Sequence, residues 1–327
     1  MTHNRCAALK VTLARLLAHS CEELACVVVC DNASTDGTSA YLATLTDPRL
    51  KRLTLTKNSG GAGGFEAALR FAQAQHPSAW YMLMDDDAYP STGTVAAFHA
   101  RAREDYDVWL SGVRYPGGDI CDMNRPWRNP FWRASLFLAA VFKGRAATHL
   151  GAQAFARGSI TEVDGGSFVG QFISRRALTR AGFPRGDLFI YADDVLFCLA
   201  LRRAGGLIAF DPALAFVHDC NTLTQDSARL ISPLWKVYFY HRNLTLAYRQ
   251  SAGPLLFWPL IALKSLSWLA KAGRYGPAKR SYLSLLGKAL QDALNGRTGN
   301  SAEEIEAFIL PQAPANESAA KATGRKP

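Results

Sequence analysis

The stretch ELACVVVCDNASTDGT, residues 23–38, carries the pattern that decides the fold. Its β-branched run predicts a buried strand, and the acid, serine, threonine and glycine residues behind it predict a turn into a helix. The same order of strand, polar turn and helix recurs from residues 49–75 and from 80 onward. This repetition predicts an α/β fold with parallel crossovers in a Rossmann-like, doubly wound sheet.

Polar residues follow each of these three predicted strands. Asp31 ends the first strand, the glycine-rich stretch NSGGAGGF at 58–65 follows the second, and three acids, Asp85 to Asp87, follow the third. Ligands of doubly wound sheets bind at the carboxyl ends of the strands. We therefore expect these three segments to converge on one edge of the sheet.

The acid cluster lies in YMLMDDDAYP, residues 81–90, where apolar residues run directly into three carboxylates. Carboxylate oxygens suit Mg²⁺ or Mn²⁺, which commonly bridge carboxylates to a diphosphate. Side chains two apart on an extended chain point the same way, so Asp85 and Asp87 can share one ion. A solvated polar loop is the competing interpretation.

The glycine-rich stretch at 58–65 is predicted to form a loop between a strand and a helix. Such a loop lets backbone N–H groups approach a phosphate or a sugar ring. It also superficially resembles a dinucleotide-binding fingerprint. However, a triple acid follows the next strand in place of a single ribose-binding acid.

A second acid pair, Asp193 and Asp194, lies in YADDVLFCLALRR at the start of a predicted amphipathic helix. The helix dipole stabilises acids at this position, so capping alone explains them. A carboxylate facing a cleft can instead act as a general base for a hydroxyl nucleophile. His218 ends an apolar strand; it is either a core residue or a further ligand beside Asp85 and Asp87.

The overall charge favours an anionic partner. The 327 residues carry 37 Lys and Arg against 27 Asp and Glu, a formal net charge of +10. Nucleic acid, a lipid surface and phosphorylated small molecules all fit this balance, but the clustered acids argue against nucleic acid. The seven cysteines form no CxxC pair, which favours reduced thiols over a disulfide framework or a zinc site. The start MTHNRCAALK lacks the apolar core of a signal peptide.

The composition changes after residue 225 and predicts three parts: an α/β domain at 1–225, a basic, mainly helical region at 226–310 and a disordered tail at 311–327. Residues 229–297 hold eleven Lys and Arg, with Asp292 as their one acid. This region either rests on an anionic membrane or forms a helical cap with solvated charges. We expect Pro259 and Lys264 to make the apolar stretch 254–272 too interrupted to span a bilayer.

Taken in order, VVVCDNASTDGT, MDDDAYP and YADD resemble an inverting glycosyltransferase of the GT-A fold, family 2, over residues 1–245. NSGGAGGF and WKVYFYHRN resemble the branch of galactofuranosyl- and rhamnosyltransferases. The resemblance implies transfer of a sugar, galactofuranose or rhamnose favoured, from a UDP- or dTDP-linked donor with Mn²⁺ or Mg²⁺. The acceptor would be a hydroxyl of a glycan or lipid-linked molecule in surface polysaccharide (cell wall) synthesis, at the cytoplasmic face of the membrane.

The resemblance also implies roles for individual residues. Asp194 would be the catalytic base, with Asp193 beside it, and Trp127, Trp132 and Gly166 would lie on the acceptor side. The metal ligands would be Asp85, Asp87 and His218. The donor would contact the end of the first strand, the glycine-rich stretch and the acid cluster through Asp31, Asn32, Asn58, Gly60, Gly61, Gly63, Gly64, Asp85 and Asp86.

Two departures from the family pattern matter. MTHNR stands at the turn that follows the family's first strand, so that strand is expected to be missing. Leu196 stands where related sequences often carry a glutamate. The alternatives are a nucleotidyltransferase, a dinucleotide-binding enzyme, or a degenerate transferase that binds without turnover.

Overall fold

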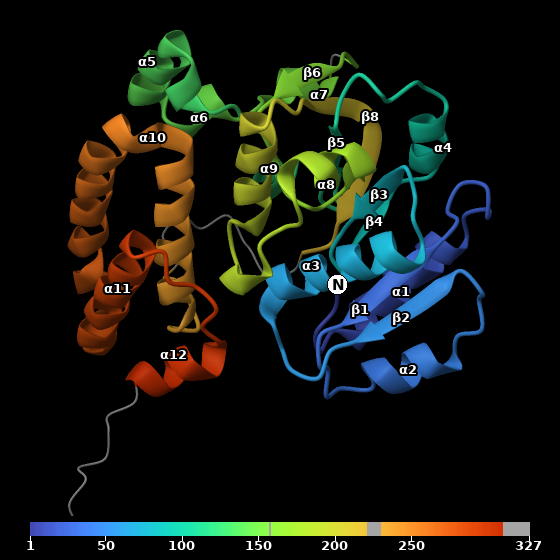
Figure 1. The fold of residues 1–327 in the computed structure, drawn as a ribbon, viewed down its shortest axis with the longest axis horizontal. Coiled ribbons are helices and arrows are strands. Elements are labelled where there is room, and N and C mark those ends of the chain that lie inside the picture. Colours follow the sequence, from blue (N-terminus) through green and yellow to red (C-terminus); the bar gives the residue numbers. More distant parts are fainter. Residues whose placement is uncertain (157, 221–229, 310–327) are drawn as a thin grey trace, which may run out of the picture.

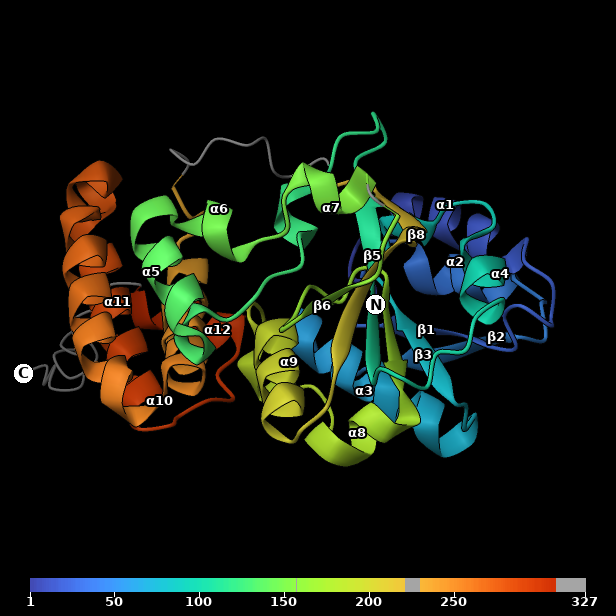
Figure 2. The ribbon, with the colours of Figure 1, turned by 90° about the horizontal axis from the view of Figure 1, so that it is seen from above.

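The computed structural model describes residues 1–156, 158–220 and 230–309. The tail expected to be disordered, 311–327, lies outside these residues. The fold is the expected mixed α/β architecture with a helical C-terminal region (Figure 1). Figure 2, seen from above, places the C-terminal helices at one end of the molecule and the strands at the other.

The first part of the fold follows the predicted pattern. Strand β1 (Val27–Asp31) pairs in parallel with β2 (Leu50–Thr54). Helices α1 (Cys6–Leu17), α2 (Thr38–Thr44) and α3 (Gly60–Gln75) surround them. Leu13 and Leu16 of α1 pack on Val27 and Val29, so one face of the pair is closed by an apolar helix.

The remaining strands form a separate mixed sheet. In spatial order they are β3 (Trp80–Leu83), β7 (Gln171–Ser174), β5 (Val108–Arg114), β8 (Ile208–His218) and β4 (Ala88–Pro90), and β6 (Thr161–Val163) pairs with β8. Strand β5 runs parallel to β8 and antiparallel to β7. The stretch at 207–220, expected to give several short strands, forms the single strand β8.

Strand β3 does not pair with β1 or β2 among the described residues; its partner is β7, in antiparallel orientation. A cavity of about 350 Å³ lies between β1 and β3, lined mainly by apolar residues of α1, β1, α3 and β3. The sequence pattern gives the order of elements along the chain, but it does not say which strand edges meet. Among the described residues, only Thr2 pairs beside β1 on this side, in parallel with Asp31.

Helices α8 (Arg175–Ala181), α9 (Asp193–Arg203) and α4 (Thr94–His99) complete the sheet domain. Residues 115–160 hold the short helices η1 (Asp122–Asn124), η2 (Pro130–Trp132), α5 (Ala134–Lys143), α6 (Arg145–Thr148) and α7 (Ala152–Ala156). A further short helix, η3 (Gly186–Leu188), precedes α9 and packs on α3. This packing brings the start of α9 toward the start of α3.

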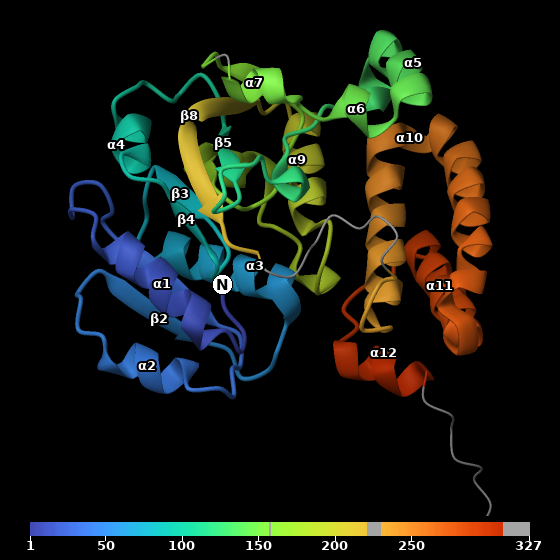
Figure 3. The ribbon, with the colours of Figure 1, turned by 180° about the vertical axis from the view of Figure 1, so that it is seen from behind.

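The C-terminal region contains α10 (Lys236–Ala270), η4 (Ala272–Ala278), α11 (Lys279–Leu294) and α12 (Ala302–Ile309). Helix α10 bends back at Gly253 (φ 70°, ψ 177°), as Figure 3 shows from behind. Pro259 was expected to interrupt the apolar stretch, but it lies inside the helix. By length and composition α10 has an apolar window long enough to cross a membrane, and 17% of that window is buried.

Candidate active site

The segment Met1–Arg5 joins the three polar clusters that were expected to converge. Thr2 donates from its amide to the carbonyl of Cys30 at 2.9 Å, and Asn32 donates to the carbonyl of Thr2 at 2.9 Å. Three residues further on, Arg5 pairs with Asp87 at 2.7 Å. The ends of β1 and β3 are therefore tied to the same short segment.

Asp31 is buried at the end of β1 with half of its carboxylate unused. Its Oδ1 accepts a hydrogen bond from the amide of Ser34 at 3.0 Å. Its Oδ2 is also buried and has no hydrogen-bond partner. Because a buried polar atom without a partner is costly, this oxygen fits a ligand that donates an N–H or O–H group.

Asn32 and Asn58 organise the start of α3. The side-chain amide of Asn32 donates to Asn58 Oδ1 at 3.1 Å and to the carbonyl of Gly60 at 2.8 Å. Its Oδ1 accepts from the amide of Ser59 at 2.9 Å. These two side chains therefore hold the glycine-rich stretch against the end of β1.

The glycines do not form the expected loop, because α3 begins at Gly60 and includes all of them. Gly60 has φ +71°, and a Cβ there would lie 2.0 Å from the carbonyl oxygen of Phe189. A Cβ at Gly64 would lie 2.3 Å from Met1 Cγ, and one at Gly63 would lie 2.5 Å from Ser59 Cβ. Glycine is thus needed here for close packing within the protein.

Asp86 and Asp87 are buried and share the guanidinium of Arg5. The Nε of Arg5 lies 3.3 Å from Asp86 Oδ1, and its Nη2 lies 2.7 Å from Asp87 Oδ2. His218 Nε2 lies 3.2 Å from the other oxygen of Asp87. Burial raises the pKa of Asp87, but hydrogen bonding and charge from His218 and Arg5 outweigh it and leave the pKa below its usual value. Arg5 has no role in the expectations from sequence, although it stands in the quoted MTHNR.

Asp85, Asp87 and His218 form a group that fits a divalent cation. Each offers a ligand atom, and these atoms lie within 4.8 Å of one another. Two carboxylates and an imidazole suit Mn²⁺ or Mg²⁺. Burial raises the pKa of Asp85, and a nearby cation would favour its ionised form.

The outer nitrogen of His218 is held by residues that the sequence pattern did not single out. Its Nδ1 lies 2.8 Å from Asn124 Oδ1 and 3.9 Å from Cys121 Sγ. Such contacts fix the orientation of a ligating ring. Cys121 and Cys220 also form a compact group with His218, although their sequence spacing resembles no metal motif.

Asp193 and Asp194 begin α9 and face the same centre. Burial, followed by the charge of Asp194, raises the pKa of Asp193 to about 8. Burial also raises the pKa of Asp194 to about 6, with a further contribution from Asp85. The amide of Ala62 donates to the carbonyl of Phe189 at 3.0 Å, and Asn32 donates to the carbonyl of Gly60 at 2.8 Å, so the loop before α9 is tied to the start of α3 and to the end of β1.

Residues 1–159, just under half of the chain, match the family model described as Glycosyl transferase family 2. The chain is a glycosyltransferase. No curated protein matches it. Among solved structures it is similar to GalNAc-T7 with UDP, GalNAc and Mn²⁺, at 13% identity and a TM-score of 0.51, covering 92% of this chain and 54% of that one. This likeness supports the GT-A fold of the glycosyltransferase.

Two further structures have lower TM-scores. The mannosyltransferase PcManGT from Pyrobaculum calidifontis, in complex with GDP-Man and Mn²⁺, is 18% identical with a TM-score of 0.49, covering 94% of this chain and 76% of that one. S. aureus TarS 1–349 in complex with UDP-GlcNAc is 16% identical with a TM-score of 0.49, covering 90% and 71%.

The loop that leads into the acid pair of the glycosyltransferase is itself in a strained conformation. Phe189, Tyr191 and Ala192 have φ values of 68°, 73° and 61°, which non-glycine residues rarely adopt. Such strain persists only where surrounding contacts enforce it, and it is common at active sites.

Arg242 and Asn243 of α10 supply those contacts, and both are completely buried. The side-chain nitrogen of Asn243 lies 3.1, 2.7 and 3.0 Å from the carbonyl oxygens of Leu188, Ile190 and Tyr191. Arg242 Nη2 donates to the carbonyl of Leu188 at 2.8 Å. Both residues lie in WKVYFYHRN, which sequence reasoning used only as a sign of family branch.

The residues expected on the acceptor side of the glycosyltransferase contact its core. Trp127 donates from its amide to Gly165 at 2.8 Å and is half-buried against the main core. A Cβ at Gly166 would lie 2.6 Å from Leu110 Cδ1. Trp132 is half-buried in η2. Leu196 is buried beside Leu188 and Leu246, so the departure from glutamate extends an apolar cluster.

Proposed function

We propose that the protein is a metal-dependent, inverting glycosyltransferase that moves a sugar from a nucleotide-sugar to a hydroxyl group. The observation that carries this proposal is the connection of the loop before the acid pair Asp193–Asp194 to the end of β1: the amide of Ala62 donates to the carbonyl of Phe189 at 3.0 Å, and Asn32 donates to the carbonyl of Gly60 at 2.8 Å. Carboxylates from two separate elements thus border one centre, one group suited to a cation and the other to a base.

Donor binding would use the end of β1 and the acid cluster. The unpaired Oδ2 of Asp31 would accept a hydrogen bond from the nucleotide base, in the manner the family resemblance implies. Asp85, Asp87 and His218 would hold a divalent cation. When bound, that cation would neutralise the negative charge that develops on the departing diphosphate. Arg5 pairs with Asp86 and Asp87 and helps to hold the pKa of Asp87 below its usual value.

Asp194 would act as the base. With a pKa of about 6 it is largely ionised near pH 7, yet it is more basic than an ordinary aspartate. It would take the proton from the acceptor hydroxyl while the acceptor oxygen forms a bond to the anomeric carbon. The bond from that carbon to the diphosphate oxygen breaks on the opposite face. This in-line displacement inverts the anomeric centre and requires no covalent enzyme intermediate.

For the substrates we favour a UDP- or dTDP-linked galactofuranose or rhamnose donor. The support is the resemblance of NSGGAGGF and WKVYFYHRN to that branch, strengthened by the role of Asn243 in holding the acid-bearing loop. The acceptor would be a glycan or lipid-linked hydroxyl in surface polysaccharide synthesis, at the cytoplasmic face of the cell membrane.

The experiment that tests the proposal separates binding from transfer. Candidate donors are screened with and without Mn²⁺, and binding is measured by calorimetry beside turnover. Asp194→Asn should abolish transfer and keep donor affinity within about threefold, because the base acts on the acceptor. Asp87→Asn should weaken metal-dependent donor binding as well. Asp119→Asn, at an exposed acid outside the site, is the matched control. Full transfer by Asp194→Asn, or undiminished turnover in excess EDTA, would disprove the assignment.

A further inference from the structure

Exposed apolar side chains are concentrated on two helices. Ten of the 18 large apolar residues that are exposed in the described part of the chain belong to α5 and to the half of α10 after its bend. Phe142 and Leu255 are the most exposed, at 84% and 85%. The ten are Phe137, Leu138, Val141, Phe142, Leu255, Leu256, Trp258, Leu263, Leu266 and Leu269. An apolar area of this extent marks a binding surface.

The second half of α10, residues 254–270, is apolar on two opposite sides. Phe257, Ile261 and Trp268 are buried with the core residues of α11. Leu255, Trp258, Leu266 and Leu269 recur at helical spacing on the other side and remain exposed. Burying the inner side is enough to hold α10 on α11. The outer apolar side is therefore free for a partner.

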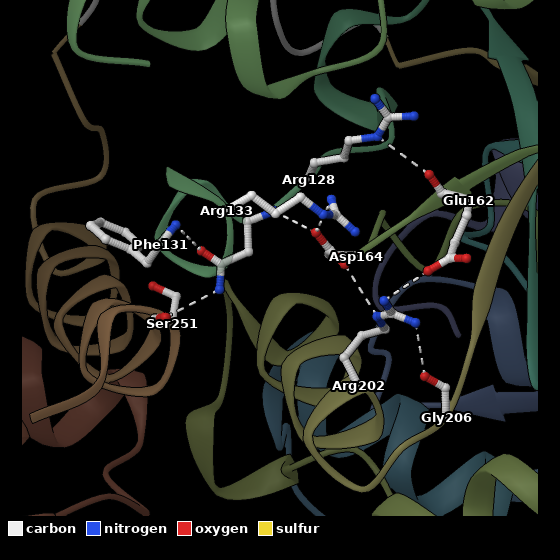
Figure 4. Close-up of polar contacts among 9 residues, drawn as sticks. Arg128, Phe131, Arg133, Glu162, Asp164, Arg202, Gly206 and Ser251 are labelled. Carbon is white, nitrogen blue, oxygen red and sulfur yellow. Dashed lines mark hydrogen bonds and ion pairs between the residues drawn. The ribbon is translucent and has the colours of Figure 1, made fainter. Parts of the chain in front are cut away.

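The chain before α5 is joined to the bend of α10 and to the sheet domain; Figure 4 labels Ser251, Asp164 and Arg202, which take part in this connection. Asn129, just before η2 and α5, donates to the carbonyl of Ser251 at the bend of α10 at 3.1 Å. The amide of Asn129 also donates to the buried Asp164 at 2.7 Å, and Arg202 of α9 donates to the other oxygen of Asp164 at 3.1 Å. The chain just before α5 and the bend of α10 are thus fastened to each other and to the sheet domain.

Charge identifies the kind of partner. Residues 123–161, which include α5, contain no acid, and neither do residues 229–291, which include α10. Exposed basic residues stand at the ends of both helices, among them Lys143, Lys271, Lys279 and Arg280. A second copy of this chain would bring these like charges face to face. An anionic lipid bilayer, in contrast, has an apolar layer beneath charged headgroups. It therefore matches both the exposed leucines and the exposed lysines of these two helices.

We propose that the exposed faces of α5 and α10 dock the enzyme on an anionic lipid bilayer and lie within its interface. The part of α10 after the bend has 17 residues, which is about 26 Å at 1.5 Å per residue and shorter than the roughly 30 Å hydrocarbon core. Its inner side is also occupied by α11. An amphipathic helix with basic residues at its ends lies in the plane of the interface. The inference rests on the proposed function only for the membrane location of the acceptor.

The test uses the full chain and vesicles without any substrate. Flotation is measured with neutral phosphatidylcholine vesicles and with vesicles that contain 30% phosphatidylglycerol. Wild type should bind the anionic vesicles, and added salt should weaken the binding. Phe142→Asp with Leu255→Asp should lower the partition coefficient at least tenfold. Val11→Asp is the matched control, because Val11 is 52% exposed on α1, away from both helices.

A second double variant distinguishes a loss of lipid binding from a loss of the fold. Lys143→Glu with Lys271→Glu leaves the apolar faces intact and should remove the preference for anionic vesicles. The proposal is overturned if wild type ignores anionic vesicles, or if folded Phe142→Asp/Leu255→Asp binds like wild type. It is also overturned if sedimentation shows a dimer that the aspartate variants dissociate. Transfer to a water-soluble acceptor is measured separately, so loss of transfer with intact vesicle binding would remove the proposed function alone.

Discussion

The side-chain nitrogen of Asn243 lies 3.0 Å from the carbonyl oxygen of Tyr191, the second residue before Asp193. One buried amide of the C-terminal region therefore fixes the backbone that presents the acid pair. Helix α10 is consequently part of the structure that holds the candidate active site, in addition to any role at a surface. This relationship makes the geometry of α9 depend on residues about 50 positions away in sequence.

Replacing Asn243 with alanine should damage catalysis more than binding. The change removes the amide nitrogen that contacts three loop carbonyls; because this NH2 has two hydrogens, the loss corresponds to about 2 kcal/mol at roughly 1 kcal/mol per hydrogen bond. The strained residues before Asp193 would then relax and shift the base. We expect kcat to fall by about 100-fold with little change in the KM for donor.

Asn295→Ala provides the control for Asn243→Ala, since Asn295 is exposed at the end of α11. It should leave kcat and the unfolding midpoint near wild type. Equal losses of kcat and of donor affinity in Asn243→Ala would show general unfolding instead of a displaced base. Steady-state kinetics and thermal unfolding together distinguish the two results.

Gly60, at the start of α3, packs directly against the backbone of the loop before α9. A Cβ at Gly60 would lie 2.0 Å from the carbonyl oxygen of Phe189, and its φ of +71° disfavours any other residue. Gly60→Ala should therefore lower the free energy of unfolding by about 2 kcal/mol or more. It should also weaken both donor binding and transfer, because it displaces the loop before Asp193.

Gly287 is the matched glycine for this experiment. It lies in α11 with nothing within 4 Å of an added Cβ. Gly287→Ala should leave activity unchanged and stabilise the fold by about 0.5–1 kcal/mol through helix propensity. A Gly60→Ala protein as stable and active as wild type would show that the two segments separate without cost.

The elements that the sequence predicted best are those with strong local patterns. The strand that ends at Asp31 and the helix that begins at Asp193 follow directly from apolar spacing and flanking polar residues. The family match confirms the glycosyltransferase interpretation over residues 1–159. The galactofuranosyl or rhamnosyl branch and the site residues stay predictions.

What the sequence could not supply were contacts between distant segments. The pairing of β3 with β7 joins residues about 90 apart, and no local pattern encodes it. The glycines at 60–64 are predicted to form a loop because glycine is rare in helices. They lie inside α3 instead, where close packing against Phe189 and Met1 requires residues without a side chain. The sequence around Asn243 is typical of a helix, and the sequence around Arg5 is typical of a turn. Neither pattern indicates the distant residues that the two side chains contact in the folded chain.

Arg5 should contribute most to the stability of the fold when no cation is bound. Its guanidinium pairs with Asp86 and Asp87, and its removal leaves neighbouring carboxylates repelling one another. Since Arg5 is 42% exposed, we expect the loss in unfolding free energy to stay near 1 kcal/mol. Added Mn²⁺ should raise the unfolding midpoint of Arg5→Ala more than that of wild type, because positive charge is restored.

The control for Arg5 is Arg15→Ala on α1, where the guanidinium lies 5.2 Å from the ring centre of Tyr89. This variant should respond to Mn²⁺ as wild type does. If Mn²⁺ stabilises wild type, Arg5→Ala and Asp87→Asn by equal amounts, the cation binds elsewhere. Thermal unfolding at low salt, with and without Mn²⁺, is sufficient for this comparison.

The acid pair predicts opposite effects of pH on rate and on stability. Asp194, with a pKa of about 6, must be ionised to accept a proton, so transfer should fall as the pH drops through about 6. Burial in the folded chain raises the pKa of Asp193 to about 8, far above that of an ordinary aspartate. Its contribution to stability is therefore complete below about 4 and is lost as the pH rises through about 8.

Asp193→Asn isolates the stability effect, because an asparagine stays neutral at every pH. The difference in unfolding midpoint between Asp193→Asn and wild type should grow in favour of the variant as pH increases from 6 to 9. The rate of transfer by wild type should increase near pH 6 and should not decrease between that pH and pH 9. A midpoint difference that does not change with pH would mean that Asp193 ionises as an ordinary surface acid, and the buried geometry of the start of α9 would then be wrong.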